Sequence, residues 1–157
     1  MISPSTAAFL EAGSALIVGS VDRDGAPHAS RGWGITVTDA ARDQVRLLMD
    51  SDDVRAASNL AETGAISITG GDVRTLRSIQ LKGHARGREA ASVRDRSWSD
   101  HFCDLFFTAV QESDGVPRVF MERLRPPELV AWTVHVEELY DQTPGPRAGN
   151  AIREGET

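Results

Sequence analysis

The stretch ALIVGSVDRDGAPHAS, residues 15–30, decides the fold because it holds a strand, a tight turn and the start of a second strand. Residues 15–21 are apolar or small and lead into a polar segment with glycine, a pattern typical of a β-strand before a turn. Asp24-Gly25 is a dipeptide that favours a tight reversal. We therefore predict that residues 26–37 return as the antiparallel partner of residues 15–21.

The returning strand carries SRGWG, residues 30–34, where a buried sheet normally carries larger apolar side chains. Strict alternation puts Ser30, Gly32 and Gly34 on one face and Arg31 and Trp33 on the other. Glycine weakens a strand, so the pair indicates close approach by a ligand or by another backbone. Trp33 either stacks on a flat ligand or belongs to the core, which is the commoner place for tryptophan in a barrel.

The rest of the chain alternates between further strands and helices. Strand patterns occupy residues 44–50, 65–69, 76–88 and 128–140, with a turn at residues 70–72 and a bulge or bend at Gly83. Helical patterns lie between Ser3 and Gly13, over 51–63 with Ser51 as the cap, from 92 to the break at 114–117, and near 118–124. The short connections favour six strands in an antiparallel sheet closed into a barrel with helices outside it, a mainly β (α+β) fold.

Length and composition limit the class of protein. We expect the 157 residues to form one domain, with an irregular tail after about residue 141 that becomes disordered after Asn150. The net charge of −6 disfavours nucleic acids and anionic membranes as partners. Cys103 is the only cysteine, no apolar run is long enough to span a membrane, and the first residues do not resemble a signal peptide. A cytoplasmic location is the expectation.

Familiar catalytic and metal-binding motifs are absent from the sequence. It has no nucleotide-binding glycine loop, no serine-hydrolase elbow and no zinc-protease motif. The four histidines (His28, His84, His101 and His135) are widely spaced, so no metal site is predicted. No residue stands out as a general acid or base.

Polar residues within and beside the strands leave two alternatives open. Ser78, Gln80 and Lys82 share one face of a strand, which either meets solvent or forms a polar ligand groove across the sheet. Arg55 lies in the first turns of a predicted helix, where the helix dipole favours an anion, and Arg77 follows a Gly-Gly turn. Each arginine is either a solvated charge or part of an anion site.

Taken in order, four segments resemble the pyridoxamine 5'-phosphate oxidase-like group of FMN-binding split barrels. They are the first hairpin, RLLMDSDDVRAASNLAETGAISIT (46–69), RSIQLKGHARG (77–87) and WTVHVEELYDQTPGPRAG (132–149). The resemblance covers residues 9–149 and implies a six-stranded antiparallel split β-barrel with flanking helices. It also implies a homodimer with FMN at the subunit interface.

The resemblance also implies which residues contact the cofactor. The strand segment with Ser30, Arg31, Gly32 and Trp33 corresponds to the family's flavin-contacting strand. Arg55 corresponds to a phosphate-binding arginine at a helix start, and Arg77, Ser78 and Gln80 correspond to a strand whose Arg-Gln pair reaches the flavin. Three carboxylates at residues 50, 52 and 53 precede Arg55 and would weaken phosphate binding unless they point away.

The resemblance implies an FMN-dependent oxidoreductase with an unidentified small-molecule substrate, and a deazaflavin is a variant of the same hypothesis. The alternative is a non-catalytic protein that binds a flavin, a deazaflavin or haem on the same scaffold, because a fold does not decide a function. A third hypothesis is that the dimer matters and the pocket is vestigial.

Overall fold

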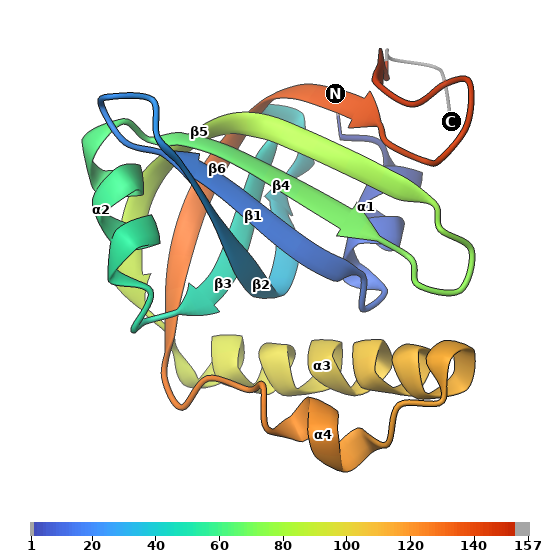
Figure 1. Ribbon diagram of the computed structural model, residues 1–157. Coiled ribbons are helices and arrows are strands. Elements are labelled where there is room, and N and C mark those ends of the chain that lie inside the picture. The colour runs from blue at the N-terminus through green and yellow to red at the C-terminus, as the bar shows by residue number, and fades with distance from the viewer. Residues whose placement is uncertain (1, 153–157) are drawn as a thin grey trace.

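The computed structural model describes residues 2–152, in which seven strands form one antiparallel sheet (Figure 1). The strands lie in the order β3-β2-β1-β4-β5-β6-β7, and β3 also pairs with β6, which closes the first six into a barrel. This confirms the six-stranded antiparallel barrel. The strand bounds are β1 Ala15–Val21, β2 Pro27–Asp39, β3 Gln44–Asp50, β4 Ala65–Gly71, β5 Ser78–Ala90, β6 Leu129–Asp141 and β7 Asn150–Ala151.

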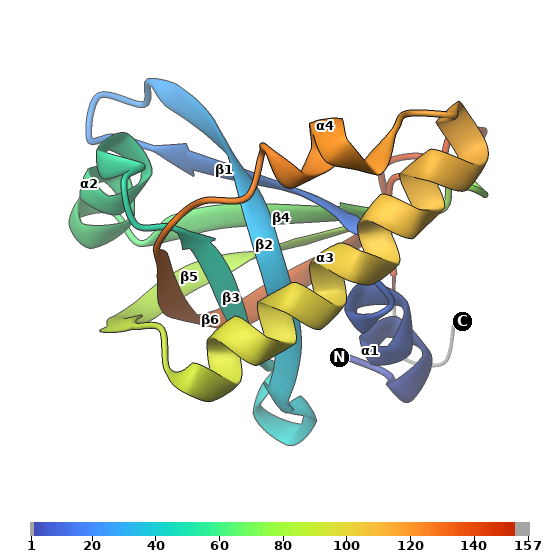
Figure 2. The ribbon, with the colours of Figure 1, turned by 90° about the horizontal axis from the view of Figure 1, so that it is seen from below.

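Four α-helices flank the barrel. They are α1 Pro4–Glu11, α2 Val54–Glu62, α3 Val93–Asp114 and α4 Arg118–Glu122, with a short 3-10 turn η1 at Ala40–Arg42. Figure 1 shows α2 at one end of the barrel. Figure 2 shows that α3 runs diagonally across β2 with α4 beside it. With α1 at the end opposite α2, the helices cover both ends and one side of the barrel, and no helix of the described residues lies over the face formed by β1, β4 and β5 (Figure 1).

Two groups of buried side chains hold these layers together. The barrel interior is filled from all six strands, for example by Leu16 on β1 and Leu47 on β3, each no more than 1% exposed. A second group lies between β2 and the pair α3 and α4, and consists of Trp33, Cys103, Phe106, Phe107, Val110 and Met121. Cys103 is thus a buried helix residue, and its burial raises the pKa of the thiol.

The expected start of α2 at Ser51 is wrong. The Asp50 side chain accepts a hydrogen bond from the Asp52 amide, and the Asp50 carbonyl accepts one from the Asp53 amide. These contacts form a turn over residues 50–53, so the helix begins only at Val54. Asp53 is the N-cap, since its carboxylate accepts a hydrogen bond from the Ala56 amide at 3.0 Å.

The strict alternation expected along β2 is also wrong, because β2 contains a bulge at Trp33. Gly32 pairs with Met49 whereas Gly34 pairs with Leu48, so one extra residue is accommodated on β2. The parity changes there, and residue 35 points into the barrel core instead of sharing a face with Trp33.

The glycines of β4 and β5 differ in how well they match the expected turn and bulge. Gly70 and Gly71 end β4 instead of forming a turn, and the chain reverses over residues 72–77. The predicted bulge at Gly83 is confirmed by a register shift between Lys82 and Gly83 in the pairing of β5 with β6. A Cβ atom at residue 83 would lie 2.0 Å from the His135 carbonyl oxygen, so only glycine fits.

An ion pair attaches the start of α3 to the barrel. Arg46 on β3 donates two hydrogen bonds to Asp95, from Nε at 2.7 Å and from Nη2 at 2.9 Å. Asp95 also accepts from the Ser92 amide at 2.8 Å, which completes a capping box. The hydrogen bond from Arg46 outweighs the effect of burial and holds the pKa of Asp95 well below its usual range.

Candidate functional site

A groove of about 600 Å³ lies on the outer face of β1 and β4 and extends onto β2, β5 and β6. We call it the outer-face groove. Small side chains form its floor. Gly19 on β1 pairs with Ala29 on one side and with Ser67 on the other, so one row across three strands carries no large side chain. A Cβ atom at residue 19 would lie 2.5 Å from Ser67 Oγ. The result is a flat, mainly apolar floor that suits the face of an aromatic ring system.

The wall on the β5 and β6 side consists of ionisable side chains that pair with one another. His84 Nδ1 lies 3.0 Å from Glu137 Oε1. The Tyr140 hydroxyl donates a hydrogen bond to Glu138, which raises the pKa of Tyr140. The Lys82 ammonium lies 4.7 Å from the centre of the Tyr140 ring. The wall thus holds two carboxylates, those of Glu137 and Glu138, and one ammonium, that of Lys82.

At the α2 end of the groove, a carboxylate is held by three donors. His28 lines the groove, and its Nε2 lies 2.9 Å from Asp53 Oδ1. The Ser30 hydroxyl donates to Asp53 Oδ2, and the Ala56 amide donates to Asp53 Oδ1. Burial alone would raise the pKa of Asp53, but the hydrogen bonds from Ser30, Ala56 and His28 together lower it. Asp53 is therefore ionised at neutral pH, and it accepts a hydrogen bond from a backbone amide in the first turn of α2.

None of the eight residues that the resemblance assigned to a cofactor lines the groove. Arg31 and Gln80 lie in the next row of the same face, because Arg31 pairs with Ile17, Ile17 with Thr69 and Thr69 with Gln80. Gln80 Nε2 donates to Thr69 Oγ1 at 3.0 Å. Ile17 is 50% exposed between them. This row continues the floor of the groove away from α2.

Arg77, Ser78 and Arg55 occupy separate places. The Arg77 guanidinium carbon lies 4.8 Å from the centre of the Phe9 ring on α1. The Ser78 hydroxyl donates to the Leu76 carbonyl at 3.1 Å. Arg55 is exposed in the first turn of α2. The structure thus spreads the eight residues over more than one site, and their role in cofactor binding stays a prediction.

Trp33 and its neighbouring glycines contact the protein itself. Trp33 is 6% exposed, and its carbonyl accepts a hydrogen bond from Ser99 on α3 at 2.7 Å. A Cβ atom at Gly32 would lie 2.8 Å from Leu16 Cβ, and one at Gly34 would lie 3.2 Å from a Leu48 methyl carbon. The close approach that the glycines allow is therefore made by side chains of the barrel.

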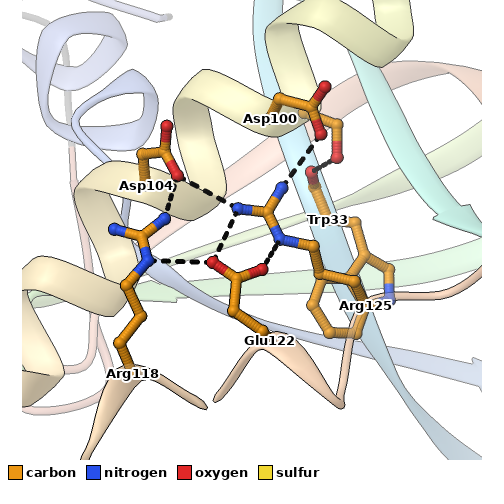
Figure 3. Close-up of polar contacts among 7 residues, drawn as sticks. Trp33, Asp100, Asp104, Arg118, Glu122 and Arg125 are labelled. Atoms are coloured by element: carbon orange, nitrogen blue, oxygen red, sulfur yellow. Dashed lines mark hydrogen bonds and ion pairs between the residues drawn. The ribbon is translucent and has the colours of Figure 1, made fainter. Parts of the chain in front are cut away.

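A network of ion pairs closes the helical layer above Trp33 (Figure 3). Arg125 donates to Asp100 at 2.9 Å and to Asp104 at 3.1 Å, both on α3. Arg118 on α4 pairs with Asp104 and donates to Glu122 at 2.9 Å. These contacts join α4 to α3, so Trp33 is covered by a fixed layer and its ring is not available to a ligand.

The sequence missed the groove because its floor depends on register. Gly19, Ala29 and Ser67 are ordinary small residues when each is taken alone. They form a row only once β2, β1 and β4 are paired. Each of β1, β2 and β4 carries one small residue of this row, and these residues become informative only when the hairpin turn fixes the register of β1 with β2.

Among residues 2–152, no three His, Cys, Asp or Glu side chains gather in a way that could hold a metal ion. Within the same residues, no helix has the length and apolar character needed to cross a membrane.

Comparison with protein families gives a match over most of the chain. Residues 2–142 match the family model described as pyridoxamine 5'-phosphate oxidase. No curated protein matches the sequence.

Solved structures with the same fold include three with informative descriptions. HupZ from Group A Streptococcus is 19% identical, with a TM-score of 0.55 over 95% of this chain and 100% of that chain. A protein described as F420 reductase is 13% identical, with a TM-score of 0.53 over 84% of this chain and 93% of that one. An FMN-binding protein from Syntrophomonas wolfei subsp. wolfei is 10% identical, with a TM-score of 0.53 over 86% and 82% of the two chains. At these identities the likeness establishes the fold alone.

Proposed function

The chain belongs to the pyridoxamine 5'-phosphate oxidase family, and from this premise we propose that it binds a flavin-type cofactor in the outer-face groove and acts as an oxidoreductase on a small molecule. The proposal includes a homodimer in which a second copy covers the groove. The observation that carries it is the flat floor of small residues, Gly19, Ala29 and Ser67, in a groove of about 600 Å³. Structural neighbours described as an F420 reductase and an FMN-binding protein support a flavin-type ring.

The groove fits the ring of such a cofactor better than its phosphate. The floor offers apolar contact over an area without projecting side chains, and Lys82 and Glu138 at its edge can orient polar ring atoms. At the α2 end, Asp53 already uses the donors of Ser30, His28 and Ala56 that a phosphate would need. The residues therefore fit a ring on the sheet and do not fit a phosphate at α2.

An exposed apolar residue supports the second copy. Ile17 is 50% exposed on the open face of the sheet, in the row beside the groove. Burying it against a partner would gain about 1–2 kcal/mol per copy. Light scattering during size exclusion tests this: we expect a dimer for the native chain and a shift toward monomer for Ile17→Glu. A native chain that is monomeric at all concentrations would contradict the proposed dimer.

A bound flavin would supply hydride or electron transfer, and the chain would supply binding, orientation and exclusion of water. The ionisable residues that line the groove all have partners within the protein. They are His28, Lys82, His84, Glu137 and Glu138. His28 and His84 each have one ring nitrogen held by a carboxylate, an arrangement that catalytic histidines also use, so these contacts do not decide between an oxidoreductase and a second candidate, a protein that binds the ring without turnover.

Titration with riboflavin and FMN, followed by flavin fluorescence, tests ring binding in the groove. Ala29→Leu adds bulk to the floor and should weaken binding about tenfold or more. Ala90→Leu makes the same change at an exposed position near the end of β5, outside the groove, and should change the affinity less than about twofold. Equal effects of the two substitutions, or no binding of either flavin, would rule out this use of the groove.

Redox cycling separates the two candidate functions. The loaded protein should lose flavin absorbance with a reduced nicotinamide and regain it with an electron acceptor if it is an oxidoreductase. A protein that binds the ring tightly and cycles no faster than free flavin would be a binding protein.

A further inference from the structure

We infer that the outer-face groove selects a flavin-type ligand whose side chain carries no phosphate, because Asp53 is a built-in anion at the α2 end of the groove. This inference rests on the proposed binding of a flavin-type ring. It names the class of ligand that this groove accepts: a planar ring with a neutral, hydroxyl-bearing side chain, as in riboflavin.

The N-terminus of a helix attracts an anion because its first amides point outward with partial positive charge. In α2 this position is filled from within the chain. Asp53 Oδ1 accepts from the Ala56 amide at 3.0 Å, and the Ser30 hydroxyl donates to Oδ2. The side chain of Asp53 is 22% exposed, so a solvent-borne anion would have to displace it.

His28 connects this carboxylate to the groove. The imidazole lines the groove and lies 2.9 Å from Asp53 through Nε2. A ligand group that reaches this end of the groove therefore meets His28, whose Nε2 is already paired with the Asp53 carboxylate. The negative charge of Asp53 lies on the far side of the imidazole from the groove. Like charges at this separation repel, and a phosphate dianion carries about two of them.

The opposite wall adds to the same preference. Glu137 and Glu138 both line it, and Lys82 is the one lysine or arginine among the lining residues. A phosphate bound against Lys82 would also lie beside these carboxylates. A hydroxyl group meets no such penalty, because it can donate hydrogen bonds to a carboxylate.

Paired titrations with riboflavin and FMN test the selection. For the native chain we expect FMN to bind at least about tenfold more weakly than riboflavin. Asp53→Ser keeps a good N-cap residue but removes the charge and frees Ser30 and His28. It should move the affinity ratio at least about tenfold toward FMN.

Asp52→Ser is the matched control, because it removes the same charge from the exposed neighbouring position. It should move the ratio less than about threefold, since exposed charges are screened. Native protein that binds FMN as tightly as riboflavin would overturn the inference, as would equal shifts in the two variants. An FMN affinity that falls more than about tenfold in Arg55→Ala would place a phosphate at α2 and also overturn it.

Thermal unfolding with inorganic phosphate, without flavin, separates this inference from the proposed function. Phosphate should raise the Tm of Asp53→Ser more than that of the native chain or of Asp52→Ser. If neither flavin binds any variant but this difference appears, the proposed function fails and the occupied anion position stands. If phosphate stabilises native protein and Asp53→Ser equally, the anion position is not filled by Asp53 and the inference fails.

Discussion

Replacing Asp95 with alanine should loosen α3 from the barrel, and the size of the effect follows from its contacts. Asp95 is the bidentate partner of Arg46, whose side chain is 23% exposed. Removing one partner of a fully buried ion pair costs about 3–5 kcal/mol. Arg46 remains partly exposed to solvent and keeps its contact with Glu89 at 3.1 Å. We therefore expect the loss of the Arg46–Asp95 pair to lower the free energy of unfolding by about 2 kcal/mol. The lost half of the capping box adds about 0.5 kcal/mol.

The total of about 2–3 kcal/mol corresponds to a fall in Tm of about 5–10 °C for a chain of this size. Urea and thermal unfolding followed by circular dichroism measure both quantities. Glu89→Ala is the control, because its side chain is 66% exposed and should cost less than about 0.5 kcal/mol.

The pH dependence of the Asp95→Ala effect provides a second check. The folded-state pKa of Asp95 is depressed, so its contribution is complete above the unfolded pKa of about 4 and is lost as the pH falls below that value. The difference in the free energy of unfolding between native and Asp95→Ala protein should therefore be constant from about pH 6 to 8 and should decrease below about pH 4. A difference that grows on acidification, or one no larger than that of Glu89→Ala, would refute the reasoning.

Four further substitutions test the packing of the barrel and the helical layer. Gly83→Ala should prevent accumulation of folded protein, because its Cβ atom would lie 2.0 Å from the His135 carbonyl oxygen; a soluble variant with native Tm would contradict this. Asn59→Ala should lower the free energy of unfolding in urea by about 1–3 kcal/mol, because Asn59 is 3% exposed and its amide donates a buried hydrogen bond at the end of the barrel; a loss below about 0.5 kcal/mol would contradict it. Arg125→Ala should cost about 2 kcal/mol and Arg118→Ala less than about 1 kcal/mol, because their side chains are 21% and 40% exposed. Equal losses in thermal unfolding would mean that burial does not decide between the two arginines.

Local patterns were sufficient for most of the barrel. The β1–β2 hairpin follows from the Asp-Gly turn, and the strand predicted at residues 44–50 has the observed bounds of β3. The bend at Gly83 was also predicted, because a glycine inside a strand indicates a site where a side chain does not fit. These features depend on residues close together in the chain.

Features that depend on contacts between distant residues were not predicted. The bulge arises where β2 pairs with β3 on both sides of Trp33 while Trp33 itself contacts α3 through Ser99. Asp53, not Ser51, caps α2, because the Asp50 side chain accepts a hydrogen bond from the Asp52 amide and holds residues 50–53 in a turn before the helix begins. The groove required the register of three strands, and its acidic wall required the pairing of β5 with β6. The carboxylates before Arg55 are evident in the sequence, but the direction in which Asp53 points depends on its contacts with Ser30 and His28 on β2.

The pairing of β6 with both β3 and β5 has a consequence for how the chain reaches its folded state. Within residues 2–152, β6 is the only strand that joins the two ends of the β3-β2-β1-β4-β5 segment of the sheet. β3 ends 79 positions before β6 begins, from residue 50 to residue 129. Until β6 is available, two unpaired strand edges can join other chains. Closure over such a long separation is slow compared with hairpin formation, because loop entropy must be lost first. Protein synthesised at high concentration should therefore aggregate through β3 and β5 unless the last long strand is added quickly.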